Sequence, residues 1–204
     1  MLQSKNLKKE KTLVIIKPDG IQRTLIGEII RRYERCGLKL VALKMLIPTR
    51  DIIKKHYISN PDWIKDKGKQ VIETYTQHNK QPPYADPHEM GEFIFDILVK
   101  YMTSGPVIAM IWQGINAIGI VRKTTGGTEP LTSDVGTIRG DLTIDSYQIS
   151  DMDKRAVRNL IHASGNPQEA QTEINLWFKK DEIISYRLIN EEILYDVNLD
   201  GILE

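Results

Sequence analysis

The chain of 204 residues is poor in several residue types, with one cysteine (Cys36) and only three phenylalanines. A single cysteine excludes an intramolecular disulfide and a zinc site built from cysteines. No apolar run is long enough to cross a bilayer. The N-terminal residues 1–11 are basic and polar and lack the apolar segment of a secretory signal. These absences predict a cytoplasmic protein.

A strong charge of either sign is also missing, because the formal net charge is +1. Such a chain has no global attraction for nucleic acid or for a membrane surface, so we expect neither as a partner. Any site for an anion must then be built locally. The composition, with 41% hydrophobic and 27% charged residues, is ordinary for a globular protein, and the length fits one domain.

The common phosphate-binding and hydrolytic motifs are absent as well. There is no GxxxxGK[ST], no GxGxxG after a strand and no HExxH, and Ser164 does not lie in a GxSxG element. These absences argue against a P-loop enzyme, a zinc peptidase and a serine hydrolase. They also predict that the protein holds no metal ion through ligands of its own.

Apolar runs alternate with segments of helical spacing along most of the chain. Strands are predicted at 12–17, 38–46, 106–112 and 157–161, with a further strand beginning at Leu142, and Pro18-Asp19-Gly20 is predicted to be a turn. Helices are predicted at 26–37, 50–57, 92–102, 116–124 and 167–178. Two folds agree with this order: a ferredoxin-like βαββαβ core, or a doubly wound parallel sheet. Periodicity alone does not decide between them.

Two segments differ in character from the rest. Residues 58–92 contain several prolines and lysines and few aliphatic residues, and residues 145–155 are polar. We interpret both as insertions into a single domain that spans residues 1–204, the first with a short helix at 69–75.

His162 lies at the end of the predicted strand 157–161, shortly before a helix that Asn166 and Pro167 are suited to begin. A side chain there is held rigidly and can still reach a ligand. From position alone, His162 could be a nucleophile, a general base, a metal ligand or none of these. The other histidines, His56, His78 and His88, lie in polar surroundings without ligand spacing and are predicted to be surface residues.

Three cations fall at breaks in the predicted elements: Lys17, Arg122 and Arg139. Lysine provides a point charge, and arginine a fork that matches phosphate oxygens. Thr128 and Asn159 add neutral hydrogen-bonding groups. Cations outside the regular amphipathic faces indicate an anion site.

Five segments resemble the nucleoside diphosphate kinase family, in the family's order. They are residues 12–20 (TLVIIKPDG), 104–107 (SGPV), 136–141 (GTIRGD), 159–164 (NLIHAS) and 173–178 (EINLWF). The resemblance covers most of residues 12–57, 93–144 and 157–186. It implies a ferredoxin-like α+β fold with an antiparallel sheet and helices on one face, and a homohexamer or a tetramer.

The resemblance also implies an activity and roles for residues. The family transfers the γ-phosphoryl group of a nucleoside triphosphate to a histidine, here His162, and then to a nucleoside diphosphate. The matching positions make Glu173, Ser164 and Tyr57 partners of the histidine. The matches for nucleotide binding are Lys17, Ile94, Arg122, Thr128, Arg139 and Asn159. Mg²⁺ would arrive with the nucleotide, held by phosphate oxygens and water.

The chain departs from the family pattern at three places. Ile94 stands where the family stacks the base on a phenylalanine, Gly165 replaces an aspartate after the histidine, and residues 58–92 and 145–155 are additional. We hypothesise that the first inserted segment covers the nucleotide. Two other classes of protein remain open: a nucleotide-binding regulatory relative that transfers no phosphate, and a ferredoxin-like interaction module.

Overall fold

The computed structural model describes residues 8–58, 61–77 and 79–195. The strands are β1 (Glu10–Ile16), β2 (Lys39–Leu46), β3 (Val107–Gly114) and β4 (Ile161–Ala163). The helices are α2 (Pro18–Gln22), α3 (Ile26–Arg35), α4 (Arg50–Tyr57), α5 (Trp63–Gln77), α6 (Pro87–Met102), α7 (Ala117–Thr125), α8 (Ile138–Leu142), α9 (Tyr147–Met152), α10 (Pro167–Trp177) and α11 (Glu191–Leu194), with a 3-10 helix at Lys180–Glu182. Within these ranges no helix is long and apolar enough to cross a membrane.

The four strands form one sheet in the order β2-β3-β1-β4. Each neighbouring pair runs antiparallel, which excludes the doubly wound parallel alternative. The elements β1, α3, β2, β3, α7 and β4 follow one another as βαββαβ, so the ferredoxin-like prediction is confirmed.

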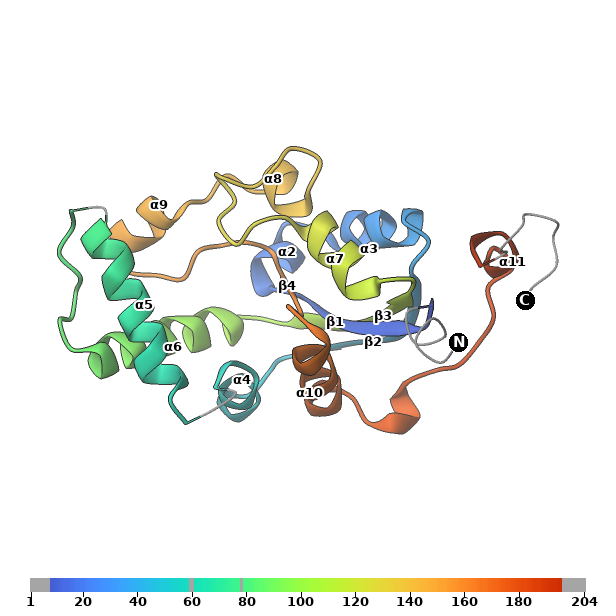
Figure 1. Cartoon of the computed structure of the whole chain (residues 1–204), viewed down its shortest axis with the longest axis horizontal. Coiled ribbons are helices and arrows are strands. Elements are labelled where there is room, and N and C mark those ends of the chain that lie inside the picture. Colours follow the sequence, from blue (N-terminus) through green and yellow to red (C-terminus); the bar gives the residue numbers. More distant parts are fainter. Residues whose placement is uncertain (1–7, 59–60, 78, 196–204) are drawn as a thin grey trace.

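Helices cover both faces of this sheet rather than one (Figure 1). The reason lies in β1, a central strand whose consecutive side chains from Thr12 to Ile16 are all buried. Leu13 and Ile15 pack in a cluster with residues of α4, α6 and α10, whereas Val14 and Ile16 pack with residues of α3 and α7. A strand that is buried on both faces has a continuous apolar sequence instead of an alternating one, and residues 12–16 have such a sequence.

Several predicted boundaries need correction. Pro18-Asp19-Gly20 begins α2 instead of forming a turn, because Pro18 suits the first helical position. The segment after Leu142 is not a strand, and Leu142 ends α8. The strand predicted at 157–161 is instead β4, which starts at Ile161, because Leu160 adopts a left-handed φ of 65° that interrupts extended backbone. The helix predicted at 69–75 is the longer α5.

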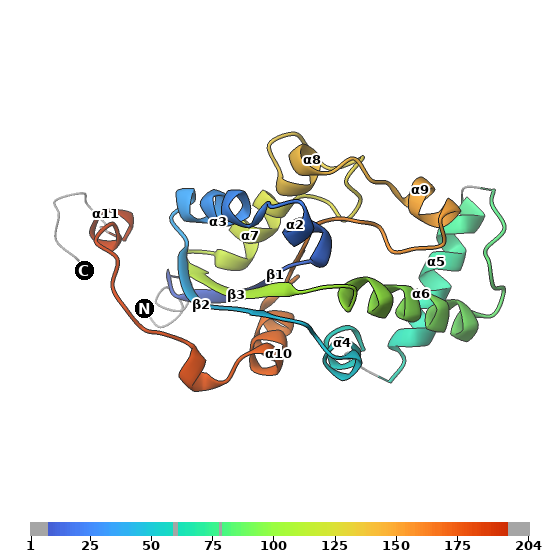
Figure 2. The same ribbon diagram turned by 180° about the vertical axis from the view of Figure 1, so that it is seen from behind.

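The two segments that we interpret as insertions meet at one end of the molecule, which we call the lobe (residues 61–92 and 145–156, with 78 outside the described residues). α5 and the first half of α6 pack together there, with α9 beside them (Figures 1 and 2). The helices approach closely through glycines: a Cβ on Gly68 would lie 1.8 Å from the Pro87 carbonyl oxygen, and one on Gly91 would lie 1.9 Å from that of Ile64.

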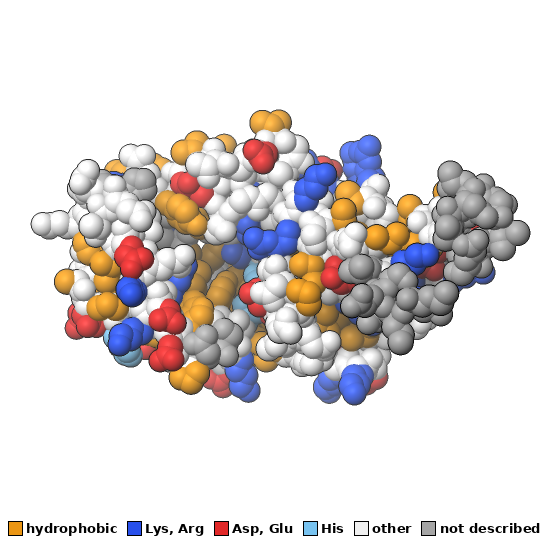
Figure 3. All heavy atoms as spheres, in the orientation of Figure 1, with side chains coloured by type: hydrophobic (Ala, Val, Ile, Leu, Met, Phe, Trp, Pro, Cys, Tyr) orange, Lys and Arg blue, Asp and Glu red, His pale blue; other side chains and the backbone are white. Residues whose placement is uncertain are grey.

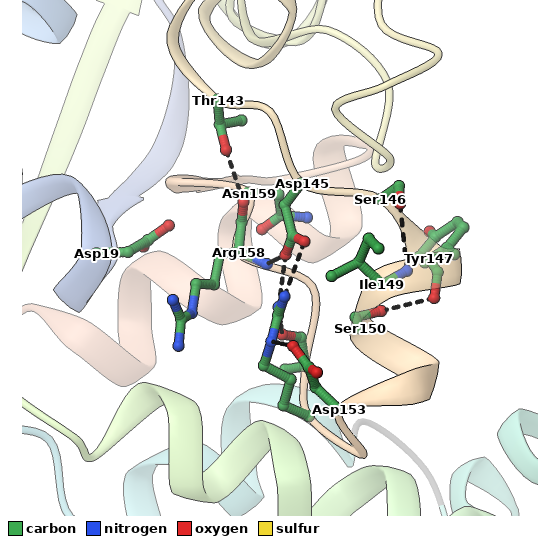
Figure 4. Close-up of polar contacts among 12 residues, drawn as sticks. Asp19, Thr143, Asp145, Ser146, Tyr147, Ile149, Ser150, Asp153, Arg158 and Asn159 are labelled. Atoms are coloured by element: carbon green, nitrogen blue, oxygen red, sulfur yellow. Dashed lines mark hydrogen bonds and ion pairs between the residues drawn. The ribbon is translucent and has the colours of Figure 1, made fainter.

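The second inserted segment is tied to the core by Asp145 (Figure 4). Its carboxylate accepts two hydrogen bonds from Arg155, at 2.6 and 2.9 Å, and one from the Arg158 backbone N–H at 2.6 Å. The Thr143 hydroxyl donates to the Arg158 carbonyl at 3.1 Å. These bonds bring the chain back from α9 to the residues just before β4.

Candidate active site

His162 lies in the middle of β4, not after a strand as the sequence predicted. It pairs with Ile15 of β1, and residues directly opposite each other in an antiparallel pair project to the same face. Ile15 faces the cluster that contains residues of α4 and α10. The His162 side chain therefore points toward these two helices, and Ser164, two residues further on, projects the same way.

Glu173 of α10 joins these two side chains. His162 Nε2 lies 2.9 Å from Glu173 Oε1, and the Ser164 hydroxyl donates to Glu173 Oε2 at 2.5 Å. Glu173 is on the buried stripe of α10 with Ala170, Ile174 and Trp177, at helical spacing. Burial raises the pKa of the Glu173 carboxyl. As a carboxylate, Glu173 accepts a hydrogen bond from the Nε2–H group, and the lone pair of the neutral His162 ring is then on Nδ1.

The imidazole of His162 is neutral at physiological pH. Burial, followed by the charges of Lys17 and Arg139, lowers its pKa to about 3. Its side chain is nevertheless 19% exposed, so a ligand can reach it. Figure 3 shows a recess between the lobe and the part of the molecule that carries α7 and α10, with Lys or Arg side chains and a histidine at its wall.

Lys17, the residue between β1 and α2, is buried and bonds to Asn159. Its Nζ donates to Asn159 Oδ1 at 2.7 Å and lies 5.2 Å from the centre of the Tyr101 ring. Asn159 Nδ2 donates in turn to the Thr128 carbonyl at 2.9 Å. Burial and the charge of Arg139 lower the pKa of Lys17 to about 7. The ammonium of Lys17 is thus poorly compensated, and an anion would stabilise it.

Arg139 lies on α8, not in a loop as predicted. Its guanidinium donates to the carbonyls of Asn159, Gly126, Gly127 and Ile161 at 2.6–3.2 Å. These bonds clamp the loop after α7 to the start of β4. Burial lowers the pKa of Arg139 to about 10, and the nearby charge of Arg122 adds to this. Arg122, on α7, and Thr128, in the loop after it, are both exposed.

Two residues that the sequence analysis did not select, Asp19 and Tyr101, hold this arrangement in place. Asp19 accepts a hydrogen bond from the Tyr101 hydroxyl at 2.6 Å and one from the Leu160 backbone N–H at 3.1 Å. The Lys17 backbone N–H donates to the Leu160 carbonyl at 2.8 Å. Both bonds fix Leu160 in its left-handed conformation, which turns Asn159 toward Lys17. The sequence signal was the PDG segment, which was interpreted as a turn and as part of the family match, with no role given to Asp19.

His56 contradicts its prediction as a surface residue. It lies in the last turn of α4, its side chain is 1% exposed, and its ring centre is 4.4 Å from that of His162. The sequence feature that could have predicted this burial is the helical spacing between His56 and Ile53, which places both side chains on the buried face of α4. Tyr57, its neighbour, lies with its ring centre 4.9 Å from that of His56. His88 is exposed on α6, as predicted, and His78 lies outside the described residues.

Ile94 lies half-buried on α6, next to the core residue Phe95. Phe95 packs edge-on against Trp63 of α5, with ring centres 6.4 Å apart, and Trp63 lies 6.3 Å from Tyr57. This aromatic row begins beside His56 and leads toward the lobe. None of the polar contacts described above includes Ile94.

His56, His162 and Glu173 offer donor atoms that lie within 4.8 Å of one another. A dication there would face the charges of Lys17 and Arg139, which act on His162. The carboxylates of Glu173 and Asp19 are each already held by two hydrogen bonds. This donor set does not fit a resident Mg²⁺, which requires several oxygen ligands.

The fold and site together define an α+β domain in which a neutral, partly accessible histidine stands beside buried cations, the chemistry that a phosphotransferase needs. The family model for nucleoside diphosphate kinase matches residues 10–71 and 64–183. A nucleoside diphosphate kinase from Pyrobaculum aerophilum is 44% identical over 179 residues, covering 86% of this chain and 98% of the relative. The chain belongs to the nucleoside diphosphate kinase family.

Solved structures agree with this assignment. The crystal structure of an NDP kinase from Pyrobaculum aerophilum matches with a TM-score of 0.82 and 42% identity, covering 87% of this chain and all of that one. A transition-state mimic of the nucleoside-diphosphate kinase from Borrelia burgdorferi, with bound vanadate and ADP, matches with a TM-score of 0.75 and 35% identity, covering 93% and 98%. The protein is therefore a nucleotide phosphotransferase.

Proposed function

We propose that this phosphotransferase works by a ping-pong mechanism in which His162 carries the phosphoryl group. In the first half-reaction, Nδ1 attacks the γ-phosphorus of a nucleoside triphosphate. The P–N bond forms, the bond to the bridging oxygen breaks, and the nucleoside diphosphate leaves. In the second, a terminal oxygen of another nucleoside diphosphate attacks the phosphorus and the P–N bond breaks. The observation that carries this proposal is the bond from His162 Nε2 to Glu173, which leaves Nδ1 as the free nucleophile.

The neighbours of His162 have distinct parts in this proposal. Glu173 holds the ring and compensates the positive charge that develops on it when Nδ1 attacks. Ser164 fixes the other oxygen of Glu173. The low pKa of His162 keeps its lone pair available. Tyr57 contributes the wall of the site beside His56.

Lys17, Arg122 and Arg139 supply the positive charge for the transferred phosphate. Lys17 uses one of its three N–H groups on Asn159, so two remain for phosphate oxygens. Arg139 uses four of its five N–H groups on backbone carbonyls, and it acts mainly through its charge and by holding the loop. Thr128 and Asn159 are assigned to phosphate or sugar, and Ile94 to the base, by resemblance alone.

Mg²⁺ belongs to this proposal as a companion of the nucleotide. When bound, it would neutralise negative charge on the nucleotide phosphates. The described carboxylates at the site are engaged with protein donors, which supports an ion held by phosphate oxygens and water. The cytoplasmic location stays a prediction from the sequence.

A homo-oligomer, hexameric or tetrameric, is also proposed. β2 is an edge strand, and edge strands offer unpaired backbone groups to another chain. Leu43 and Met45 on it are 48% and 57% exposed, and Val135 and Ile144 in the loops around α8 are 94% and 100% exposed. Exposed apolar side chains of this size indicate contact surfaces. Light scattering of the purified protein would measure its mass.

The test of function is mass spectrometry after incubation with ATP and Mg²⁺. The wild type should gain one acid-labile phosphoryl group on His162 and lose it when a nucleoside diphosphate is added. His162→Ala should gain none and should not turn over. His88→Ala, which changes a histidine on α6, is the matched control and should behave as the wild type. A phosphoryl group that is gained but cannot be passed to a diphosphate would contradict the proposal.

A further inference from the structure

His56 is a buried histidine that the proposed reaction does not use. Three rings surround it: that of His162 at 4.4 Å, Tyr57 at 4.9 Å and Trp177 at 5.7 Å, all at steep interplanar angles of 72–87°. A leucine or phenylalanine could fill such a space without the cost of burying two ring nitrogens. The presence of an imidazole here therefore needs an explanation.

Trp177 determines which nitrogen of His56 carries the proton. The indole Nε1 is a donor only, and it lies 3.3 Å from His56 Nδ1. Nδ1 must therefore accept, and the proton of the neutral ring is on Nε2. Among the described residues, His56 Nε2 is buried and has no hydrogen-bond partner. An unpaired buried polar group destabilises the folded state, so the contact at Nδ1 is maintained at the expense of stability.

The contact matters because His56 Nδ1 also faces Glu173. It lies 3.7 Å from Oε1, the same oxygen that is 2.9 Å from His162 Nε2. A proton on His56 Nδ1 would be attracted to that oxygen, and a shift of a few tenths of an ångström would bring Nδ1 within hydrogen-bond distance, so that His56 would compete with His162. Because Trp177 donates to Nδ1, this competing tautomer is suppressed, and Oε1 remains available to His162.

We propose that His56 is a positioning residue: with Trp177 it reserves Glu173 Oε1 for His162 Nε2, and its ring packs edge-on against His162, so that Nδ1 of His162 stays aimed at the incoming phosphate. The inference rests on the proposed function, because it assumes that His162 is the nucleophile. It assigns no contact with substrate to His56. Both parts of the role concern the tautomer and the orientation of the His162 ring.

The test compares three variants of the full-length protein. Trp177→Phe removes the donor and frees Nδ1 of His56 to carry a proton. His56→Leu removes both nitrogens, and His56→Asn keeps an acceptor oxygen close to the position of Nδ1. We expect the rate of His162 phosphorylation by saturating ATP to fall about tenfold in Trp177→Phe and His56→Leu, since small misplacements of a reacting group are costly, with KM little changed. His56→Asn should recover most of the rate.

Two further readouts separate positioning from a general loss of structure. Long-range ¹H–¹⁵N spectra should show His162 as the Nε2–H tautomer in the wild type and as a mixture in Trp177→Phe. In the His56→Leu background, Trp177→Phe should have little further effect, because the competitor is already absent. If Trp177→Phe or His56→Leu does not fold, the rate of His56→Asn and the His162 tautomer in the wild-type spectrum still test the proposal.

The outcomes are distinguishable. A wild-type protein that is never phosphorylated on His162 would contradict the proposed function. A wild type that is phosphorylated, with unchanged rates and an unchanged His162 tautomer in both Trp177→Phe and His56→Leu, would contradict the role of His56 alone. Equal losses in His56→Leu and His56→Asn, without any change of tautomer, would also overturn it.

Discussion

The site around His162 and the contact between α5 and α6 in the lobe are built in opposite ways. At the site, buried charged and polar groups bond to one another, and single side chains such as Glu173 and Arg139 serve several partners. In the lobe, two helices touch through glycines, and charged side chains such as Lys65 face solvent. A change at the site should therefore affect chemistry, whereas a change in the lobe should affect local stability or nucleotide affinity.

The largest expected effect comes from removing Lys17. Lys17→Met keeps much of the side-chain length but deletes the charge beside His162. We expect kcat/KM to fall on the order of 10²–10³-fold, since the loss of one preorganised donor to a developing charge has costs of this size. Lys65→Met, on the exposed face of α5, is the matched control and should change kcat/KM less than twofold. Similar losses in both variants would remove the distinction between site and lobe.

The second-largest expected effect is a dependence of KM on pH. Because the pKa of Lys17 in the free protein is about 7, we expect KM for the nucleotide to rise above pH 7, by up to about tenfold per pH unit. His162, with a pKa of about 3, should produce no acid limb near 6.5 in kcat/KM. The Lys17→Met variant should lack the alkaline change. An acid limb near 6.5 that disappears in an otherwise active variant at His56 would assign that limb to His56 instead.

The same pKa values predict how the free energy of unfolding depends on pH. Lys17 binds its proton more weakly in the folded state than at its ordinary value of 10.5, so between pH 7 and about 10 the unfolded chain holds more protons. Its contribution to the free energy of unfolding therefore rises with pH over this range. For His56 and His162, both with a pKa of about 3, the contribution falls as the pH drops from 6.5 toward 3. Urea unfolding at several pH values measures both.

The sequence alone was sufficient to predict the elements that have a clear apolar pattern. The strand expected at 12–17 is β1, and the helix expected at 50–57 is α4 with Thr49 at its cap, because a buried strand and a capped amphipathic helix both depend on local spacing. It also selected Lys17, His162 and Glu173, which the structure brings together. It failed where long-range contacts decide the conformation. Leu160 is left-handed because of Asp19 and Lys17, which are remote in sequence.

The errors at the site have the same origin. His56 follows two lysines and looked solvated, but burial depends on α10 packing over α4, which no local pattern reports. Arg139 stood between glycines and was expected in a loop, yet Thr137 caps a short helix there by accepting from the Gly140 N–H. The two segments of the lobe were recognised by their composition only. Neither segment alone contains a pattern that predicts their contact with each other.

A change confined to the lobe should be smaller for catalysis than for stability. Gly68→Ala would place a Cβ against the Pro87 carbonyl, so α5 and α6 must separate, at a cost of roughly 1–3 kcal/mol. Hydrogen exchange should accelerate in α5 and in the first half of α6 but not in β1 or α10. Gly119→Ala is the matched control, since a Cβ there meets nothing within 4 Å in α7, and it should stabilise slightly. Loss of His162 phosphorylation in Gly68→Ala would show that the lobe and the site form one unit.

The smallest expected effect tests whether the two inserted segments act together on the nucleotide. The Tyr75 side chain of α5 interacts with Asp151 of α9, and both residues line a cavity of about 550 Å³. α9 connects in turn to the site, because the Tyr147 backbone N–H donates to Glu129 at 2.9 Å, one residue after Thr128. If the lobe covers the nucleotide, Tyr75→Phe removes one link of that cover.

A single hydrogen bond of this kind contributes roughly 0.5–1.5 kcal/mol, so KM in Tyr75→Phe should rise at least twofold and by no more than about tenfold, with kcat unchanged. Tyr84→Phe changes another lobe tyrosine, one that contacts Phe93 through its ring, and should leave KM as it is. A rise in KM for Tyr75→Phe alone would mean that α5 and α9 hold the nucleotide as a single body. No change in either variant would mean that the lobe stands beside the nucleotide without covering it, and the inserted segments would then have to be explained by contacts with other chains.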